Sequence, residues 1–190
     1  MTPLVAVRLA WGVWAVSWGA AAAWSDQPVA RPAPGRERSY LLVTILGALL
    51  LFGIYAPRTA VGRLLWPLGR LIAWAMVALA VAGFLFAWWA RVHLGRLWSS
   101  RVTRKPDHHV VDTGPYRLVR HPIYSGIILA TLATAVLRDN LLGVVGALLM
   151  LCGWYLKARL EEQFLRDELG SEQYEAYRAR VPMLVPFTRG

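Results

Sequence analysis

Five apolar segments, each almost free of charged residues, dominate this chain. They lie at about residues 4–24, 40–56, 67–90, 123–137 and 141–156. The first and third exceed the roughly 20 residues that an α-helix needs to cross the hydrocarbon core of a bilayer. In a soluble domain, apolar residues would instead recur on one helix face or at alternate strand positions. The pattern therefore predicts an all-α fold, a polytopic transmembrane bundle of about five membrane helices.

The last two apolar segments are short and lie close together in the chain. They hold 15 and 16 residues, and only Arg138, Asp139 and Asn140 separate them. As helices they would be about 22–24 Å long at about 1.5 Å per residue. We predict one tight helical hairpin that either crosses a thinned bilayer or dips deeply into it. Either geometry returns the chain to the side of the membrane that it left.

The tail after residue 156 has a different pattern. Apolar residues recur there at helical spacing beneath a charged face, which predicts a cytoplasmic C-terminal amphipathic helix. Gly170 would end this helix and Ser171 would cap another. We expect a single integral membrane domain over 1–190. Residues 1–90 would form three transmembrane helices, and residues 91–190 a cofactor-binding loop, the hairpin and the tail.

Basic residues are divided unequally between the two sides of the predicted bundle. Of 21 lysines and arginines, 16 fall in the loops at 25–39 and 91–122 and in the tail, and five fall on the other side. The positive-inside bias puts the N-terminus outside and the loops and tail in the cytoplasm. The net charge of +10 thus indicates contact with anionic lipid rather than with nucleic acid. The Ala-, Arg- and Trp-rich composition suggests a prokaryotic inner membrane.

The sequence indicates neither a metal site nor a soluble nucleotide-binding domain. His108 and His109 are adjacent, but no HExxH helix or spaced cysteine pair accompanies them. The single cysteine, Cys152, is expected to be a small buried hydrophobe. Because GxGxxG and P-loop motifs are missing, any cofactor must be held by the loop, the tail and the helix ends.

The stretch "TGPYRLVRHPIYSG", residues 113–126, gathers polar chemistry just before the hairpin. Pro122 suits the first position of a helix, where its missing N–H costs nothing. The free N–H groups of that helix start, beside His121, would offer a seat for an anion. Arg117 and Arg120 would either join this site or merely anchor the chain at the membrane interface.

Glu161 and Glu162 follow the last apolar segment by five and six residues. Alone, such a pair is most simply a solvated face of an amphipathic helix. The hairpin, however, returns both its ends to one membrane face, so these acids should meet Arg117, Arg120 and His121. A zwitterionic ligand that carries a sulfonium, a ribose diol and a carboxylate would need this mixture of charges.

These motifs together resemble a known family. "HVVDTGPYRLVRHPIYSG", the short apolar hairpin and "RLEEQFLRDELGSEQYEAYRARVPMLVPF" are similar to the isoprenylcysteine carboxyl methyltransferase family, over about residues 88–187. Phospholipid methyltransferases share the pattern more distantly. The resemblance implies a helical membrane bundle whose cytoplasmic end encloses S-adenosylmethionine.

The resemblance also implies roles for individual residues. The cofactor-binding residues would be His108, Gly114, Tyr116, Arg117, His121, Pro122, Tyr124, Gly126, Glu161, Glu162 and Arg180. Arg120 would position an anionic acceptor, and Glu162 would act as the base if the acceptor were an amine or a hydroxyl. Arg180, Pro182 and Pro186 would close a lid over the site.

The function that this resemblance implies is a membrane methyltransferase whose acceptor is lipid-like or hydrophobic. O-methylation of an isoprenylcysteine-like carboxylate is favoured, and a phospholipid amine or a small thiol are alternative acceptors. The bilayer and the acceptor would be the partners, with no nucleic acid and no metal. A membrane NADPH-dependent reductase of the steroid-reductase type and a non-catalytic membrane protein are the rival interpretations. The tight spacing of RHPxYxG, hairpin and acidic pair favours methyl transfer.

Overall fold

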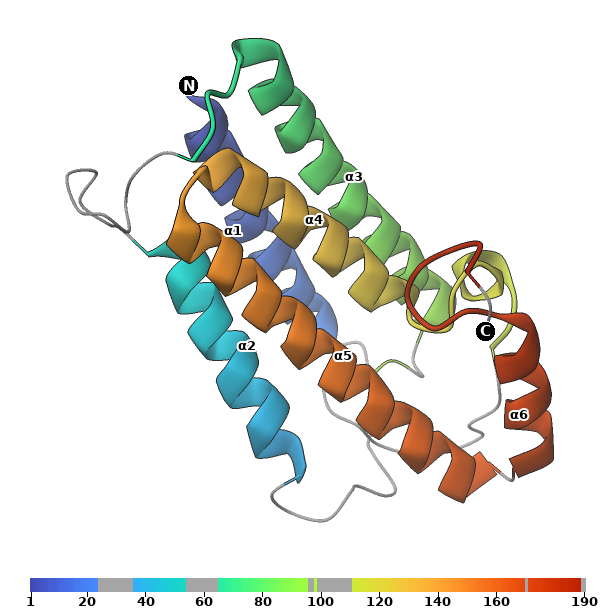
Figure 1. Ribbon diagram of the computed structural model, residues 1–190. Coiled ribbons are helices and arrows are strands. Elements are labelled where there is room, and N and C mark those ends of the chain that lie inside the picture. Colours follow the sequence, from blue (N-terminus) through green and yellow to red (C-terminus); the bar gives the residue numbers. More distant parts are fainter. Residues whose placement is uncertain (24–35, 54–64, 96–97, 99–110, 170, 189–190) are drawn as a thin grey trace.

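The computed structural model describes residues 1–23, 36–53, 65–95, 98, 111–169 and 171–188 (Figure 1). In this part of the chain we find six α-helices and one short 3-10 helix, and no β-strand. The elements are α1 (Pro3–Ala22), α2 (Arg36–Phe52), α3 (Arg70–Leu94), η3 (Gly114–Arg117), α4 (Pro122–Arg138), α5 (Leu141–Leu169) and α6 (Ser171–Arg180). The predicted all-α class is confirmed for these residues.

Within the described residues, three stretches of helix are long and apolar enough to cross a membrane. They are α1, α3 and the first 26 residues of α5, Leu141–Arg166. The apolar helix α4, with 17 residues, is shorter. These lengths and compositions support an integral membrane protein.

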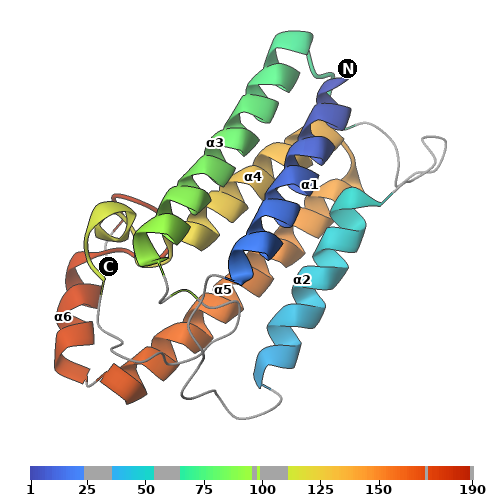
Figure 2. The same ribbon diagram turned by 180° about the vertical axis from the view of Figure 1, so that it is seen from behind.

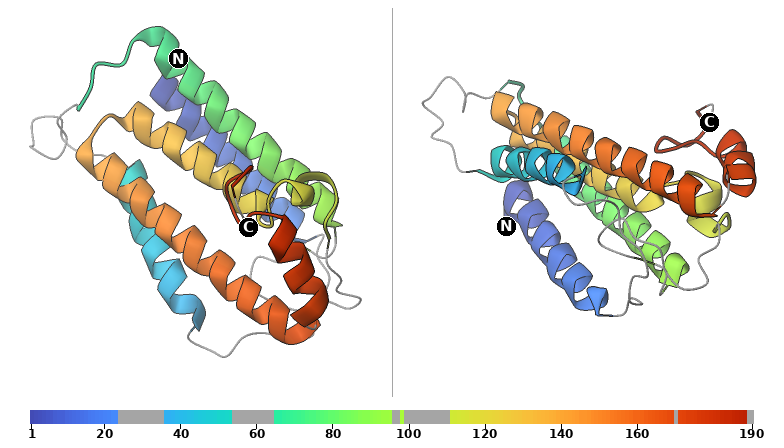
Figure 3. Two further views of the ribbon diagram at one scale, coloured as in Figure 1. Left: turned by 45° about the vertical axis from the view of Figure 1, so that its right-hand side comes forward. Right: turned by 90° about the horizontal axis from the view of Figure 1, so that it is seen from below.

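The long helices form a bundle whose functional elements gather at one end. α4 packs against α3 and also against α5, and α2 packs along α5. α1 contacts α3 and α4, and it lies behind α4 in Figure 1 and in front of it in Figure 2. The end of α3, the start of α4 and α6 lie at one end of the bundle. The N-terminus and the turn between α4 and α5 lie at the other (Figure 3).

Glycines allow two of these helix pairs to approach closely. A Cβ atom added to Gly83 of α3 would lie 2.5 Å from the carbonyl oxygen of Gly126 in α4. A Cβ atom added to Gly47 of α2 would lie 2.7 Å from the carbonyl oxygen of Gly146 in α5. Small residues are common where membrane helices pack backbone to backbone. These glycines therefore allow α4 to pack closely on α3 and α5 to pack closely on α2.

The hairpin turn is built by its own polar side chains, which confirms the predicted tight connection. Asp139 adopts a left-handed conformation with φ 50°. Its carboxylate accepts hydrogen bonds from the backbone N–H groups of Leu65, at 3.0 Å, and Trp66, at 2.6 Å. The side-chain oxygen of Asn140 accepts one from the N–H of Gly143 at 2.7 Å and caps α5. The turn is thus joined to the segment that leads into α3.

The second helix of the hairpin is longer than predicted. We expected it to end near residue 156 and an amphipathic helix to follow, but α5 runs unbroken for 29 residues to Leu169. The reason is local, because "KARLEEQFLR" consists almost entirely of good helix formers and contains neither Gly nor Pro. The helix expected after Gly170 is α6, and Ser171, predicted as its cap, is its first residue. Cys152, expected to be buried, is exposed on α5.

Candidate functional site

The start of α4, the second half of α5 and the chain after α6 meet at one end of the bundle (Figure 1). We call residues 181–188 the C-terminal strap. Its carbonyl groups accept hydrogen bonds from the residues around the start of α4. Arg120 N donates to Pro182 O at 2.8 Å, and His121 N donates to Met183 O at 3.1 Å. The hydroxyl of Ser125 donates to Leu184 O at 2.6 Å. The strap is therefore fixed against the residues that the sequence singled out.

His121 occupies the N-cap position of α4 and Pro122 its first turn, as the sequence predicts. The His121 ring makes no capping hydrogen bond and is buried beside two carboxylates instead. Its Nδ1 lies 3.5 Å from Glu161 Oε2 and its Nε2 lies 3.4 Å from Glu162 Oε1. Burial by itself lowers the pKa of His121, but the contacts with Glu161 and Glu162 raise it above its ordinary value. The imidazole is therefore more fully protonated at neutral pH than a free histidine.

Glu162 and Arg120 form the buried centre of the site. Arg120 Nε donates to Glu162 Oε1 at 2.7 Å, and both side chains are almost fully buried. The same guanidinium donates to the carbonyl oxygen of Arg178 at 3.0 Å and to that of Val181. Arg120 thus joins α5 to the end of α6 and to the strap. A buried carboxylate of this kind needs such a partner, because an unpaired buried charge is costly.

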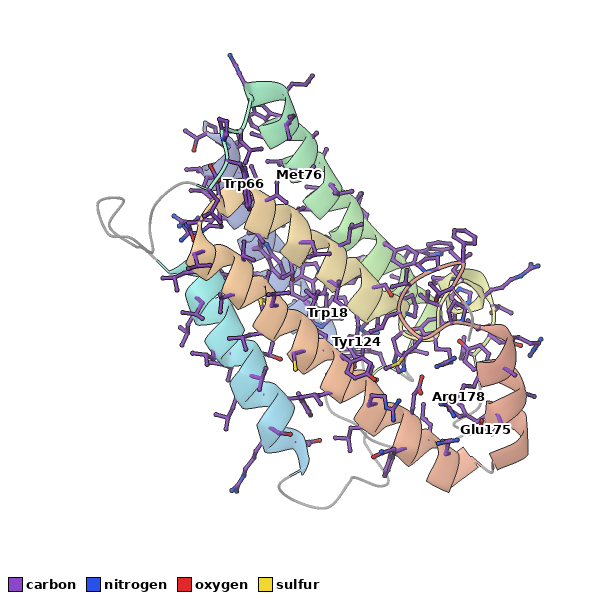
Figure 4. All side chains as sticks on the ribbon, in the orientation of Figure 1. Trp18, Trp66, Met76, Tyr124, Glu175 and Arg178 are labelled. Carbon is purple, nitrogen blue, oxygen red and sulfur yellow. The ribbon has the colours of Figure 1, made fainter. Side chains whose placement is uncertain are left out.

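Tyr124 joins the acidic pair to the aromatic interior of the bundle. Its hydroxyl donates to Glu161 Oε1 at 2.5 Å. Its ring stacks with His121, at 5.5 Å between centroids, and with Trp154 of α5, at 5.2 Å. Figure 4 labels Tyr124 near α5, and Arg178 on α6 at the same end of the bundle. Polar hydrogen bonding and apolar packing therefore meet at this one side chain.

Gly114 and Tyr116 are placed by η3 against α3, where they shape the loop. Gly114 has φ 55°, and a Cβ atom there would lie 2.7 Å from the His93 ring. The Tyr116 ring is buried, and its hydroxyl lies 3.5 Å from the carbonyl oxygen of Ala90. Tyr177 of α6 donates its hydroxyl to Tyr116 O at 2.7 Å. These residues connect the loop to α3 and α6 beside the acidic network.

The remaining residues singled out from the sequence lie outside this network or outside the described chain. Arg117 is exposed at the end of η3. The Arg180 side chain is two-thirds exposed and pairs with Asp112 at 3.5 Å. Gly126 packs against α3. His108 lies outside the described residues.

Three side chains in or beside the site were missed by the sequence analysis as site residues. Arg178 lies 3.8 Å from Glu162 and also pairs with Glu175 at 3.4 Å. Trp154 stacks on Tyr124, and Lys157 is buried with its ammonium 5.3 Å from the same ring. The i,i+4 spacing of Lys157 and Glu161 could have indicated that both lie on one helix face.

One family model matches the part of the chain that runs from α3 into α5. The model of the isoprenylcysteine carboxyl methyltransferase (ICMT) family matches residues 76–166. A methanethiol S-methyltransferase from a Pseudomonas species is 33% identical over 168 residues, which is 82% of this chain and 61% of the relative. A methanethiol S-methyltransferase from Mycobacterium tuberculosis is 33% identical over 167 residues, 81% of this chain and 65% of the relative.

A probable protein-S-isoprenylcysteine O-methyltransferase from Oryza sativa subsp. indica is 32% identical over 119 residues. That match covers 61% of this chain and 62% of the relative. The matches therefore span about three fifths of the length of these three relatives.

Proposed function

We propose, on the premise that the chain is a member of the isoprenylcysteine carboxyl methyltransferase family, that it is a membrane methyltransferase that uses S-adenosylmethionine. The observation that carries the proposal is the buried network of Arg120, His121, Tyr124, Glu161 and Glu162. Four of these five side chains can carry charge near neutral pH, and all five lie within the region that the family model matches. So much buried charge at a helix end is typical of a binding or catalytic site.

The side chains present fit the chemistry of S-adenosylmethionine. The carboxylate of Glu161 is partly accessible and can accept hydrogen bonds from an ammonium or a ribose diol. Arg178, whose side chain is one-third exposed, can meet a carboxylate. Among the described residues, His121 Nε2 is buried without a hydrogen-bond partner, although Glu162 lies 3.4 Å away. We therefore assign cofactor binding to His121, Tyr124, Glu161 and Glu162.

When bound, S-adenosylmethionine supplies a methyl group on a sulfonium and leaves as S-adenosylhomocysteine. The residues of this chain would orient the acceptor and exclude water from the reacting atoms. A carboxylate acceptor needs no general base, whereas an amine or a hydroxyl would need one, for which Glu162 is the candidate. Arg120 would act as a positioning residue, because it holds Glu162 and the strap together.

The first acceptor class that we propose is the carboxylate of a hydrophobic molecule such as an S-prenylated cysteine. A small thiol is the second acceptor class, because the matches to two methanethiol S-methyltransferases cover more of this chain than the match to the rice relative. The two methanethiol S-methyltransferases match over 82% and 81% of this chain, whereas the rice relative matches over 61%. The longer matches support the thiol as the second acceptor class, and it would react as its thiolate.

For the membrane arrangement we propose five membrane helices, α1 to α5, in a prokaryotic inner membrane. The N-terminus would lie outside and the site in the cytoplasm. Support comes from the bundle itself, because the predicted basic side carries the end of α3, the start of α4 and α6 (Figure 3). Positively charged segments remain on the cytoplasmic side during insertion.

Calorimetry on the folded protein in detergent tests the proposed cofactor. S-adenosylhomocysteine should give saturable heat, and NADPH, the cofactor of the rival reductase interpretation, should give none. Methyl transfer from labelled S-adenosylmethionine should then be measured with an S-prenylated N-acetylcysteine, methanethiol and phosphatidylethanolamine. Heat with NADPH alone would overturn the proposal in favour of a reductase.

A further inference from the structure

Two polar groups lie buried in the middle part of α5, before the acidic pair in the chain. Trp154 and Lys157 lie seven and four residues before Glu161, within the apolar stretch Leu141–Arg166. At about 1.5 Å per residue, Trp154 is about 10 Å deeper along the helix than Glu161. Polar and ionisable groups at this depth are costly, and where they occur they usually serve function.

The indole N–H of Trp154 lacks a partner in the described part of the chain. Its Nε1 atom is buried and makes no hydrogen bond there. A buried donor left unpaired costs about 1–3 kcal/mol, so native proteins pair nearly all of them. The ring itself is fixed, because it stacks on Tyr124 at 5.2 Å with 26° between the ring planes. The donor is therefore held in place at the edge of the network that contains Glu161.

Lys157 places a cation near the Trp154 ring. Its side chain is only 7% exposed. The ammonium lies 5.3 Å from the ring of Tyr124 and 5.7 Å from the rings of Tyr40 and Trp154. It also interacts with the carboxylates of Glu161 and Glu37. Aromatic rings at these distances stabilise a buried ammonium and keep its position defined.

The surroundings of the two groups are apolar and aromatic. Trp154 packs on the core cluster that contains Tyr124 and Ile127, and Trp14 and Trp18 of α1 pack on the same cluster. Trp14 likewise has a buried Nε1 atom with no hydrogen-bond partner among the described residues. This combination suits a ligand that has an apolar body and one polar end.

We propose that Trp154 Nε1 and Lys157 Nζ form the subsite that binds the anionic head of the methyl acceptor, a carboxylate or a thiolate. The inference rests on the proposed methyltransferase function. It adds the position of the acceptor and the atoms that bind its head. The apolar body of the acceptor lies against the tryptophans of α1, and its head lies next to Tyr124.

The distribution of charge in the network supports this assignment. Arg120 donates to Glu162 and to two carbonyl groups, and the rest of the network is acidic or is bonded to acids. An anionic acceptor would be repelled by Glu161 and Glu162 unless a cation lay on its own side. Lys157, one helical turn before Glu161, supplies that cation, and Trp154 supplies a neutral donor beside it.

The test compares an S-prenylated N-acetylcysteine with its methyl ester, which lacks the negative charge. The wild-type protein in nanodiscs should bind the carboxylate on the order of ten-fold more tightly than the ester, because hydrogen bonds to charged groups contribute most. Trp154→Phe keeps the stacking and removes the N–H, and Lys157→Met removes the charge. Each should reduce this preference on the order of ten-fold, and S-adenosylhomocysteine affinity is measured for each variant in parallel.

Trp89→Phe is the matched control, because Trp89 is half-exposed on α3, and it should retain the preference. Equal binding of carboxylate and ester by the wild type would overturn the subsite. A preference that persists in both Trp154→Phe and Lys157→Met, each folded by thermal unfolding, would overturn it as well. The comparison of carboxylate and ester is repeated without S-adenosylhomocysteine. If the protein does not bind S-adenosylhomocysteine, the proposed methyltransferase function is contradicted. The preference for the carboxylate still tests the subsite independently.

Discussion

At the scale of single residues, the site is a set of buried charges that stabilise one another. Glu162 is paired with Arg120 at 2.7 Å, and His121 lies within 3.5 Å of both glutamates. Taking ions out of water costs several kcal/mol each, so a buried network persists only when its members are paired and hydrogen-bonded. Each member consequently affects the others, and substitutions have to be compared as a group.

Substitution of the acidic pair should separate cofactor binding from acceptor positioning. Glu161→Gln and Glu162→Gln each remove a charged hydrogen bond, worth roughly 1.5–3 kcal/mol, and should weaken S-adenosylhomocysteine binding on the order of 10- to 150-fold. Arg120→Lys keeps the charge but cannot reproduce the planar fork that reaches Glu162, Arg178 O and Val181 O. It should lower turnover and leave that affinity within a few-fold.

The measurement is a pair of titrations, for ligand affinity and for methyl transfer, with thermal unfolding as the control for folding. If Arg120→Lys abolishes ligand binding while both glutamine variants bind normally, the roles are reversed. Arg120 would then hold the carboxylate of the cofactor, and the acidic pair would only maintain the structure.

At the scale of the elements, the site depends on how closely α4 approaches α3. Gly83 and Gly126 bring the two backbones together, and α4 begins at Pro122 directly beside the network. A shift of α4 would move both His121 and Tyr124 relative to α5. Packing between helices therefore determines the geometry of the acidic network.

Gly126→Ala should destabilise the protein and weaken cofactor binding. The new Cβ atom would meet the backbone carbonyl of Gly83, which cannot rotate away as a side chain could. Overpacking of this kind costs about 1–3 kcal/mol. Gly12→Ala is the control, because the described chain has no atom within 4 Å of a Cβ atom there. It should be neutral or slightly stabilising, since alanine favours helix. Equal thermal unfolding of the two variants would contradict this account.

At the scale of the whole molecule, α4 and α5 run in opposite directions, and this brings distant segments of the chain to one end of the bundle. α4 leaves that end and α5 returns to it, so the start of α4 meets residues 161–162 and the strap (Figure 1). α3 runs toward the same end and delivers the loop that contains η3. The site therefore requires all three helices, although its polar residues come from short motifs.

A reporter fused after Gly190 should be active only in the cytoplasm. The expectation follows from the 16 basic residues on the loops and tail against five on the other side. A second fusion before Pro3 should report the opposite side. Activity of the C-terminal fusion in the periplasm would contradict the proposed orientation.

The sequence by itself determined the helical class, the hairpin turn and the start of α4. Each of these depends on local information: apolar length, the polar turn residues Asp139 and Asn140, and the fixed φ of Pro122. It also singled out Arg120, His121, Tyr124 and the acidic pair, because their motifs are specific. The length of α5 was underestimated, since the change from apolar to charged residues was taken as a helix boundary.

Only the tertiary structure decided which of these residues meet. The pairing of Arg120 with Glu162 joins residues 42 positions apart, and the stacking of Tyr124 on Trp154 joins residues of two helices. Arg117 and Arg120 are alike in the sequence, yet the first is exposed and the second is buried. From the sequence, Lys157 was only one of the basic residues of the tail. In the structure it lies within α5, and its ammonium is 5.3 Å from the Tyr124 ring. Contacts of this kind depend on helix rotation and crossing, which are set by packing across the whole bundle rather than by any local stretch of sequence.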